Sequence, residues 1–166
     1  RFSRTIEQCN IGLQKNMVYQ ITGISPDQLE NVMNAPGAVR VTASNKPGFP
    51  CRVSLEDAEP GEELLLFNYL SLDVESPYRS SYAIYARIEA KASARYTDAI
   101  PPIFVGRPLG MRAFGKDAML KTARLSMPGD ADATIRQLFE LDEIAYIDVH
   151  NAAHGCFAAR VERFLS

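Results

Sequence analysis

The sequence predicts an α+β domain dominated by antiparallel strands, with a strongly bent sheet or partly closed barrel and about two helices. About eight short segments rich in β-branched, aromatic and aliphatic residues are separated by proline and glycine turns. Only two segments show helical spacing, and the C-terminal segment has the pattern of a hairpin. A chain of 166 residues fits one domain spanning residues 1–166, in which residues 1–16 are expected to be poorly ordered or peripheral.

The first helix is predicted from its end signals and the second from the spacing of its apolar residues. Ser25 is a suitable N-cap for the first helix, Pro26 suits its first turn, and Pro36 followed by Gly37 ends it. The second helix is predicted from Ala131 to about residue 141, because its apolar residues recur every three or four positions. The rest of the chain is expected to be extended or looped.

The predicted strands alternate with loops that proline shapes. Residues 46–50 and 76–81 form two such loops, since proline fixes φ and removes a backbone donor. In residues 51–55, alternation places the Cys, Val and Leu side chains on one face of a half-buried strand. The expected strands cover residues 17–22, 39–43, 51–55, 64–70, 82–88, 144–150 and 156–164, with short extended pieces near residues 103–105, 110–114 and 119–126.

The composition of the chain indicates which classes of partner and which cellular location to expect. Eighteen basic side chains against twenty acidic ones give no general attraction to nucleic acid or to an anionic membrane, so neither partner is expected. No run approaches the roughly 18 apolar residues that span a bilayer, and the first residues lack the apolar core of a secretory signal. Three cysteines without a Cys-x-x-Cys pair favour free thiols, and therefore a cytoplasmic location.

Three separated blocks of the chain have a familiar pattern. They are Pro-Gly-Phe-Pro-Cys-Arg-Val-Ser-Leu-Glu-Asp-Ala-Glu-Pro-Gly-Glu at 47–62, Ser-Pro-Tyr-Arg-Ser-Ser at 76–81, and Val-His-Asn at 149–151 followed by Gly-Cys-Phe-Ala-Ala-Arg at 155–160. In this order, over residues 18–163, they resemble the bacterial family called domain of unknown function 1203. The resemblance implies a single-domain bacterial cytoplasmic protein, and it implies no activity and no catalytic or binding residue.

The C-terminal hairpin gives the first candidate site. Because side chains two apart in a strand share a face, Tyr146, Asp148 and His150 are expected to point the same way. If a five-residue loop pairs His150 with Cys156, Asp148 lies opposite Ala158 and Tyr146 lies opposite Arg160. The expected cluster is therefore Tyr146, Asp148, His150, Cys156 and Arg160, unless this face is simply solvated.

Arginines in the two proline loops give the second candidate site. Arg52 and Arg79, together with Arg160, suit forked hydrogen bonding to a carboxylate or phosphate. Tyr78 and Asn151 could orient such a ligand. The alternative is that each arginine braces its own loop by donating to backbone carbonyls.

The cysteines and histidines allow two interpretations. Cys51 is either a buried small hydrophobe or a nucleophile next to Arg52, and Cys156 is the better thiol candidate because His150 is its expected neighbour. His150, His154 and Cys156 do not have the spacing of a zinc site, so no metal and no cofactor are expected.

The sequence leaves the function open among three hypotheses. The first is a binding domain that holds a small anionic or polar ligand, or a peptide, in a pocket of Arg, Tyr and His side chains. The second is a Cys/His-dependent hydrolase or transferase with His150 as general base. The third is a structural or self-associating subunit, and the oligomeric state is not predicted. The candidate binding residues are Cys51, Arg52, Tyr78, Arg79, Tyr146, Asp148, His150, Asn151, Cys156 and Arg160.

Overall fold

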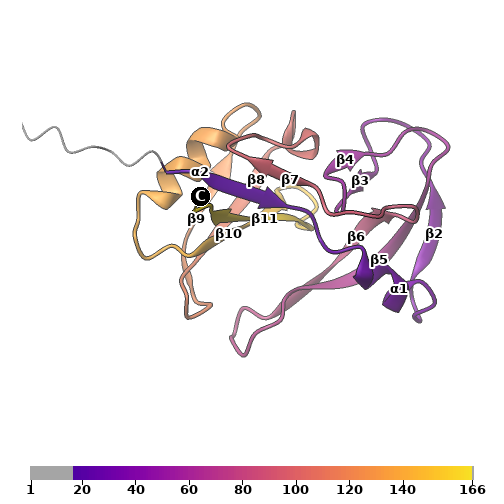
Figure 1. Cartoon of the computed structure of the whole chain (residues 1–166), viewed down its shortest axis with the longest axis horizontal. Helices are drawn as coiled ribbons and strands as arrows, with labels where there is room; N and C mark the ends of the chain where they lie inside the picture. The colour runs from indigo at the N-terminus through magenta and orange to yellow at the C-terminus, as the bar shows by residue number, and fades with distance from the viewer. Residues whose placement is uncertain (1–16, 166) are drawn as a thin grey trace, which may run out of the picture.

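The chain forms two mostly antiparallel sheets and two α-helices in a computed structural model that describes residues 17–165. The predicted α+β class is confirmed, whereas the expected bent sheet or partly closed barrel is wrong. The strands of the protein divide between two open sheets, which lie end to end in Figure 1. Neither sheet is closed or strongly curled. The predicted peripheral segment, residues 1–16, lies outside the described residues.

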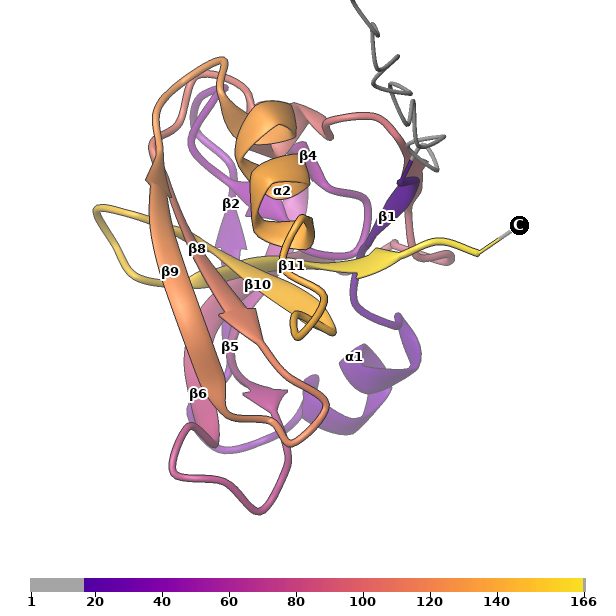
Figure 2. The same ribbon diagram turned by 90° about the vertical axis from the view of Figure 1, so that its left-hand side faces the viewer.

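The six-stranded sheet carries the second helix. That helix, α2 (Ala131–Phe139), lies across one face of the sheet in Figure 2, where its buried side chains meet those of the strands. Every strand pair in this sheet is antiparallel. The strand order is β7 (Arg95–Thr97), β1 (Tyr19–Thr22), β11 (Phe157–Arg163), β10 (Tyr146–Asn151), β8 (Leu109–Phe114) and β9 (Leu120–Ser126).

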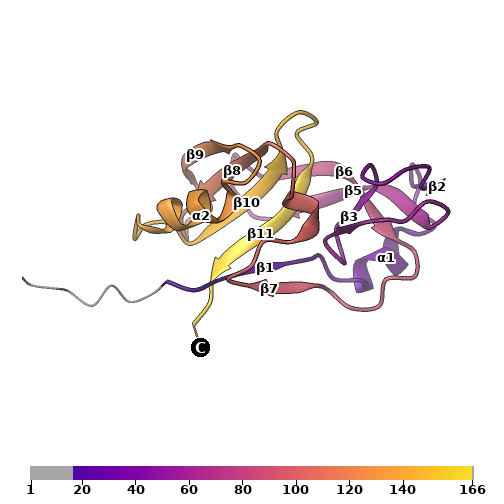
Figure 3. The same cartoon turned by 90° about the horizontal axis from the view of Figure 1, so that it is seen from above.

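The five-stranded sheet is built around a long hairpin. Its two hairpin strands, β5 and β6, extend towards the six-stranded sheet, as Figures 1 and 3 show. The helix α1 (Asp27–Val32) packs Leu29 into the core of this sheet. The strand order is β2 (Val39–Thr42), β5 (Glu63–Leu72), β6 (Ser80–Arg87), β3 (Pro50–Cys51) and β4 (Glu56–Asp57), and only β3 and β6 pair in parallel.

The hydrophobic core has two main parts that meet at β11. Ile135 and Leu138 of α2 pack against Met111, Val149 and other apolar side chains on one face of the six-stranded sheet. The second part fills the five-stranded sheet, yet it includes Phe157 of β11. One strand therefore contributes to both cores, which fixes the sheets relative to each other.

The predicted helix boundaries are close to the observed ones. In α1 the N-cap position is Pro26 instead of Ser25, although the Ser25 hydroxyl still accepts a hydrogen bond from the Asp27 N–H (3.3 Å). The helix ends at Val32, before the predicted stop at Pro36. A difference of one residue is normal at a helix end, whereas the C-terminal end comes about three residues earlier than predicted.

Two predicted strands are wrong because the chain turns there. After β3, the N–H of Leu55 donates to the carbonyl of Cys51 (2.9 Å), and Leu55 adopts a positive φ of 56°. Residues 51–55 therefore form a tight turn, in which Arg52 is buried together with the expected apolar side chains. The segment 103–105 is likewise not extended, because Pro102–Phe104 forms a 3₁₀ turn. The strands β4 and β7 were not predicted, since they are too short for alternation to show.

The turn at residues 51–55 is held by close backbone contacts. The N–H of Ile24 donates to the carbonyl of Arg52 (2.9 Å), and the N–H of Ala94 donates to the carbonyl of Val53 (2.8 Å). Gly23 lies so near that a Cβ atom there would approach the Val53 carbonyl oxygen to 2.1 Å. Only glycine fits this position without displacing the turn.

We expect Gly23→Ala to lower the free energy of unfolding by about 2 kcal/mol. The added methyl group would clash with the backbone carbonyl of Val53, which the hydrogen bonds of the turn hold in place. Urea denaturation measures the change. The matched control is Gly110→Ala, since a Cβ at Gly110 in β8 meets no atom within 4 Å. Equal stabilities for the two variants would contradict this role of Gly23.

Candidate functional site

The face of the six-stranded sheet away from α2 carries a row of charges across neighbouring strands. Asp148 of β10 lies between Arg160 of β11 and Arg112 of β8 in the strand register. Arg160 grips both carboxylate oxygens of Asp148, with Nε to Oδ1 at 2.7 Å and Nη2 to Oδ2 at 2.9 Å. Asp148 is only 2% exposed, so this forked pair neutralises a buried carboxylate.

The β5–β6 hairpin packs over this charged row. The Tyr82 ring of β6 stands edge-on to the His150 ring, with centroids 4.9 Å apart. Arg160 donates to the carbonyl of Ser71 (3.3 Å), and its guanidinium lies 4.3 Å from the Tyr146 ring centroid. We call this group the cross-sheet cluster; it consists of Tyr82, Arg112, Tyr146, Asp148, His150 and Arg160.

Arg112 has the least satisfied charge in the cross-sheet cluster. Its Nη1 donates to the Tyr82 hydroxyl at 3.3 Å, and its guanidinium carbon lies 5.5 Å from the Phe114 ring centroid. Within residues 17–165, no carboxylate lies within 4.0 Å of it. Arg160 takes both oxygens of Asp148, so among residues 17–165 the charge of Arg112 has no carboxylate partner.

The His150 imidazole is buried beside this charge in a defined tautomer. Its Nδ1 lies 3.0 Å from the carbonyl oxygen of Gly155, and because a carbonyl only accepts, Nδ1 carries the proton. The lone pair therefore lies on Nε2, which has no hydrogen-bond partner among the described residues. Burial lowers the pKa of His150, and the positive charges of Arg112 and Arg52 lower it further. The hydrogen bond to Gly155 and the charge of Asp148 raise this pKa, but by less, so it stays below its usual value. His150 is neutral at pH 7.

A space opens on the sheet next to Arg112 and His150. Gly110 lies opposite His150 in the β8–β10 register and two residues before Arg112. A Cβ on Gly110 would meet no atom within 4 Å. Its other cross-strand partner, Leu125 of β9, is 65% exposed. A ligand group above Gly110 would thus reach a guanidinium and an imidazole from the same position.

Four of the five residues of the predicted hairpin cluster, Tyr146, Asp148, His150 and Arg160, belong to the cross-sheet cluster, without Cys156 and in a different register from the predicted one. Asp148 pairs with Arg160 instead of Ala158, Tyr146 pairs with Glu162, and His150 pairs with Phe157. The cause is a bulge between Val149 and His150, together with a longer connection between the strands. The bulge brings Arg160 next to Asp148, where it forms the forked ion pair.

Arg52 and Cys51 lie sealed inside the protein. Arg52 is 4% exposed and donates to the carbonyls of Phe157 (2.9 Å) and Pro50 (2.6 Å), while burial lowers its pKa to about 10. The Cys51 sulfur is fully buried and lies 3.2 Å from the Arg87 N–H, which donates to it. Arg52 thus braces the fold, and Cys51 occupies the core.

The remaining predicted residues are not members of the cross-sheet cluster. Arg79 forms an exposed ion pair with Asp73 (2.9 Å), and Tyr78 packs edge-on to Phe114. The Asn151 side chain accepts hydrogen bonds from the backbone of the following turn, so it shapes the hairpin loop. Cys156 is half-buried, and within residues 17–165 no hydrogen bond joins its thiol to His150.

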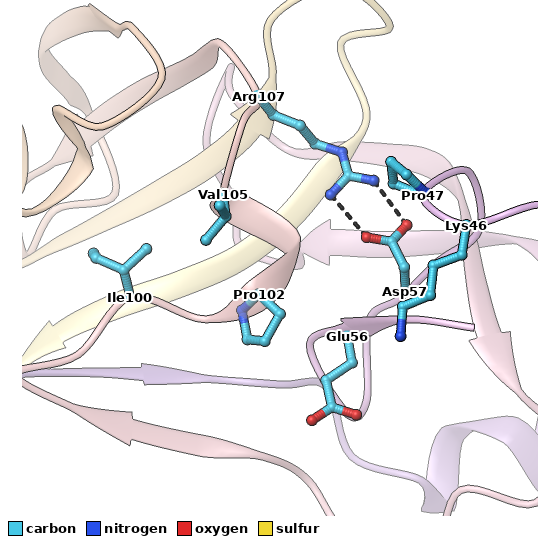
Figure 4. Close-up of a pocket in the computed structure, with 8 residues that line it drawn as sticks. All are labelled: Lys46, Pro47, Glu56, Asp57, Ile100, Pro102, Val105 and Arg107. Carbon is cyan, nitrogen blue, oxygen red and sulfur yellow. Dashed lines mark hydrogen bonds and ion pairs between the residues drawn. The ribbon is translucent and has the colours of Figure 1, made fainter. Parts of the chain in front are cut away.

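Two open cavities lie away from these predicted residues. One, of about 530 Å³, lies between the loop before β3 and the 3₁₀ turn; Figure 4 shows the buried Asp57–Arg107 pair at its wall. It is lined by Lys46, Pro47, Glu56, Asp57, Ile100, Pro102, Val105 and Arg107. The other, of about 700 Å³, lies near the β8–β9 loop and the C-terminal residues.

Sequence reasoning missed Arg112, Tyr82 and Gly110. Each lies in a predicted strand, and nothing local distinguishes it. Only the pairing of β8 with β10 and the packing of β6 across that pair bring them together.

Residues 17–165 contain no group of three or more histidine, cysteine or acidic residues arranged to hold a metal ion. Neither of the helices described is long and apolar enough to cross a membrane.

Comparison with known proteins gives one match. A family model described as "Protein of unknown function (DUF1203)" matches residues 48–163, which is more than half of the chain. No curated protein and no solved structure matches.

We expect the free energy of unfolding to fall as the pH drops below about 6.5, the ordinary pKa of histidine. The unfolded chain then binds a proton at His150, whereas the folded chain resists it because its pKa is lowered. Arg112, Asp148, Arg52 and Tyr82 face this imidazole.

Urea denaturation between pH 7.5 and 5.5 measures this dependence. His150→Gln should flatten the pH profile in that window, while His154→Gln, which changes the exposed second histidine, should leave it as it is. An unchanged slope in His150→Gln would show that other groups cause the dependence.

Proposed function

The chain belongs to the DUF1203 family of proteins of unknown function, and we propose that it is a binding domain for a small ligand that carries a carboxylate or phosphate group. The ligand lies above Gly110 and binds to Arg112. The observation that carries the proposal is the guanidinium of Arg112, which has no carboxylate partner within residues 17–165 and lies beside open space. A half-buried, uncompensated arginine attracts an anion, and its fork suits planar or tetrahedral oxygens.

His150 and Tyr82 add selectivity to this anion site. The neutral imidazole offers a lone pair on Nε2, so it accepts a hydrogen bond and does not add positive charge. The Tyr82 hydroxyl already accepts from Arg112 and can donate its own proton to the ligand. These groups favour a ligand that has a hydroxyl or N–H donor close to its anionic group, such as a hydroxy acid or a phosphate monoester.

The geometry favours binding over the other two hypotheses. A Cys/His enzyme needs a thiol within hydrogen-bond reach of its base, and Cys51 is instead enclosed in the core. A self-associating subunit would not need an unpaired arginine beside an imidazole. A small-ligand site uses both features.

We expect Arg112→Gln to weaken binding of inorganic phosphate and of glycolate at least tenfold, because it removes the charge-assisted hydrogen bonds. Titration followed by backbone amide NMR shifts measures binding, and the shifts should centre on Gly110, Arg112 and His150. Arg79→Gln is the matched control, since Arg79 is exposed and already paired with Asp73.

Two further variants separate binding from folding. Gly110→Val should block the ligand by filling the open space without any change in charge. Arg160→Gln should destabilise the fold by about 3 kcal/mol, because it leaves the buried Asp148 unpaired, whereas Arg112→Gln should not destabilise it. Equal phosphate binding by the wild type and Arg112→Gln would refute the proposed site.

A further inference from the structure

We infer that the cavity between the loop before β3 and the 3₁₀ turn binds a second kind of ligand, a small organic ammonium ion with a short apolar body. The cavity, of about 530 Å³, has the size of small-molecule sites. It shares no residue with the cross-sheet cluster, so this inference stands independently of the anion site.

The two cations that line the cavity are already occupied. Arg107 forms a forked pair with Asp57, at 2.7 and 3.0 Å, and also donates to the carbonyl of Ile103 (2.9 Å). Burial alone would raise the pKa of Asp57, but hydrogen bonds from Arg107 and the Gly48 N–H outweigh it and keep the carboxyl ionised. Lys46 is paired with Glu59. Neither cation is therefore free to attract an anion.

Glu56 is the charged group that remains available. Its side chain is 51% exposed, and its nearest cationic atom, Nη1 of Arg87, lies 3.6 Å away, beyond hydrogen-bond length. The Arg87 guanidinium instead donates its hydrogen bonds to Glu62, to the Ser54 hydroxyl and to the carbonyl of Asp57. Within residues 17–165 the Glu56 carboxylate accepts no hydrogen bond, which leaves its oxygens open to a donor.

The charge balance around the cavity favours a cation. With their ion-pair partners, Lys46, Arg87 and Arg107 bring three positive charges, while Glu56, Asp57, Glu59 and Glu62 bring four negative ones. One negative charge is left, because Glu56 and Glu62 share the guanidinium of Arg87, which donates its hydrogen bond to Glu62. An ammonium group would supply both the missing charge and the missing N–H donors.

An apolar wall lies beside these charges. Figure 4 shows Ile100 and Val105 on the side of the cavity away from Lys46 and Glu56. Pro102 lies between these two sides. Val105 is 67% exposed, so its apolar side chain is open to contact with a ligand. A ligand with three to five methylene groups would cover this wall while its ammonium group meets Glu56, so alkylammonium ions fit the cavity better than inorganic cations.

Titration with butylammonium, butyrate and 1-butanol, followed by amide NMR shifts, tests this inference. We expect butylammonium to shift the amides of residues 56 and 100–107 at concentrations where butyrate and butanol do not. Glu56→Gln should weaken butylammonium binding at least tenfold, and Val105→Ser should weaken it about threefold through lost apolar contact. Glu75→Gln, an exposed glutamate in the β5–β6 loop, is the control for general charge.

Several results would overturn the inference. They are equal binding of butyrate and butylammonium, unchanged affinity in Glu56→Gln, and unchanged affinity in Val105→Ser. Arg112→Gln should bind butylammonium like the wild type, so failure of one site is distinguishable from failure of the other. Because Glu56 and Val105 are exposed, both variants should keep the wild-type melting temperature, which is measured alongside.

Discussion

The buried side chain of Arg52 joins the two sheets of this protein, and the geometry of the cross-sheet cluster depends on that junction. Its Nε donates to the carbonyl of Phe157 in β11, and its Nη1 donates to Pro50 in β3. Its backbone N–H donates to Tyr85 in β6, and its carbonyl accepts from Ile24. Burial lowers the pKa of this guanidinium only to about 10, so it stays charged at neutral pH and needs these carbonyl dipoles. The sheets are therefore held at the place where β6 can reach β10.

Three arginines near this junction differ in what surrounds them. Arg52 is satisfied by backbone carbonyls, and Arg160 by the buried carboxylate of Asp148. Among residues 17–165, Arg112 has only a 3.3 Å hydrogen bond to the Tyr82 hydroxyl and an aromatic neighbour, Phe114. Residue type alone does not distinguish a bracing arginine from a binding one, because the same guanidinium serves both purposes. The partner decides the role, and strand pairing decides the partner.

The sequence predicts the parts of this fold that depend on local patterns. Alternation and helical spacing locate the hairpin strands and α2, because these signals involve residues a few positions apart. The turn at residues 51–55 has the same alternation as a strand, but its internal hydrogen bond and its backbone contacts with distant segments, Ile24 and Ala94 among them, make it a turn. For the site, alternation correctly groups Tyr146, Asp148 and His150, but a single bulge changes their partners. The role of Arg112 could not be predicted from the sequence, because its neighbours come from strands that are distant in sequence.

The position of Arg112 contributes little to the fold and carries a cost. A half-buried charge without a counter-ion raises the free energy of the folded state, and a neutral residue of similar length would relieve it. Gly110, two residues earlier, adds a second cost, because glycine inside a strand has more backbone entropy to lose than alanine and packs nothing. Both costs fall at one spot, beside a neutral imidazole with a free lone pair. An anion bound there would remove the first cost and fill the space left by the second. Local departures from stable design that coincide in this way are typical of binding sites.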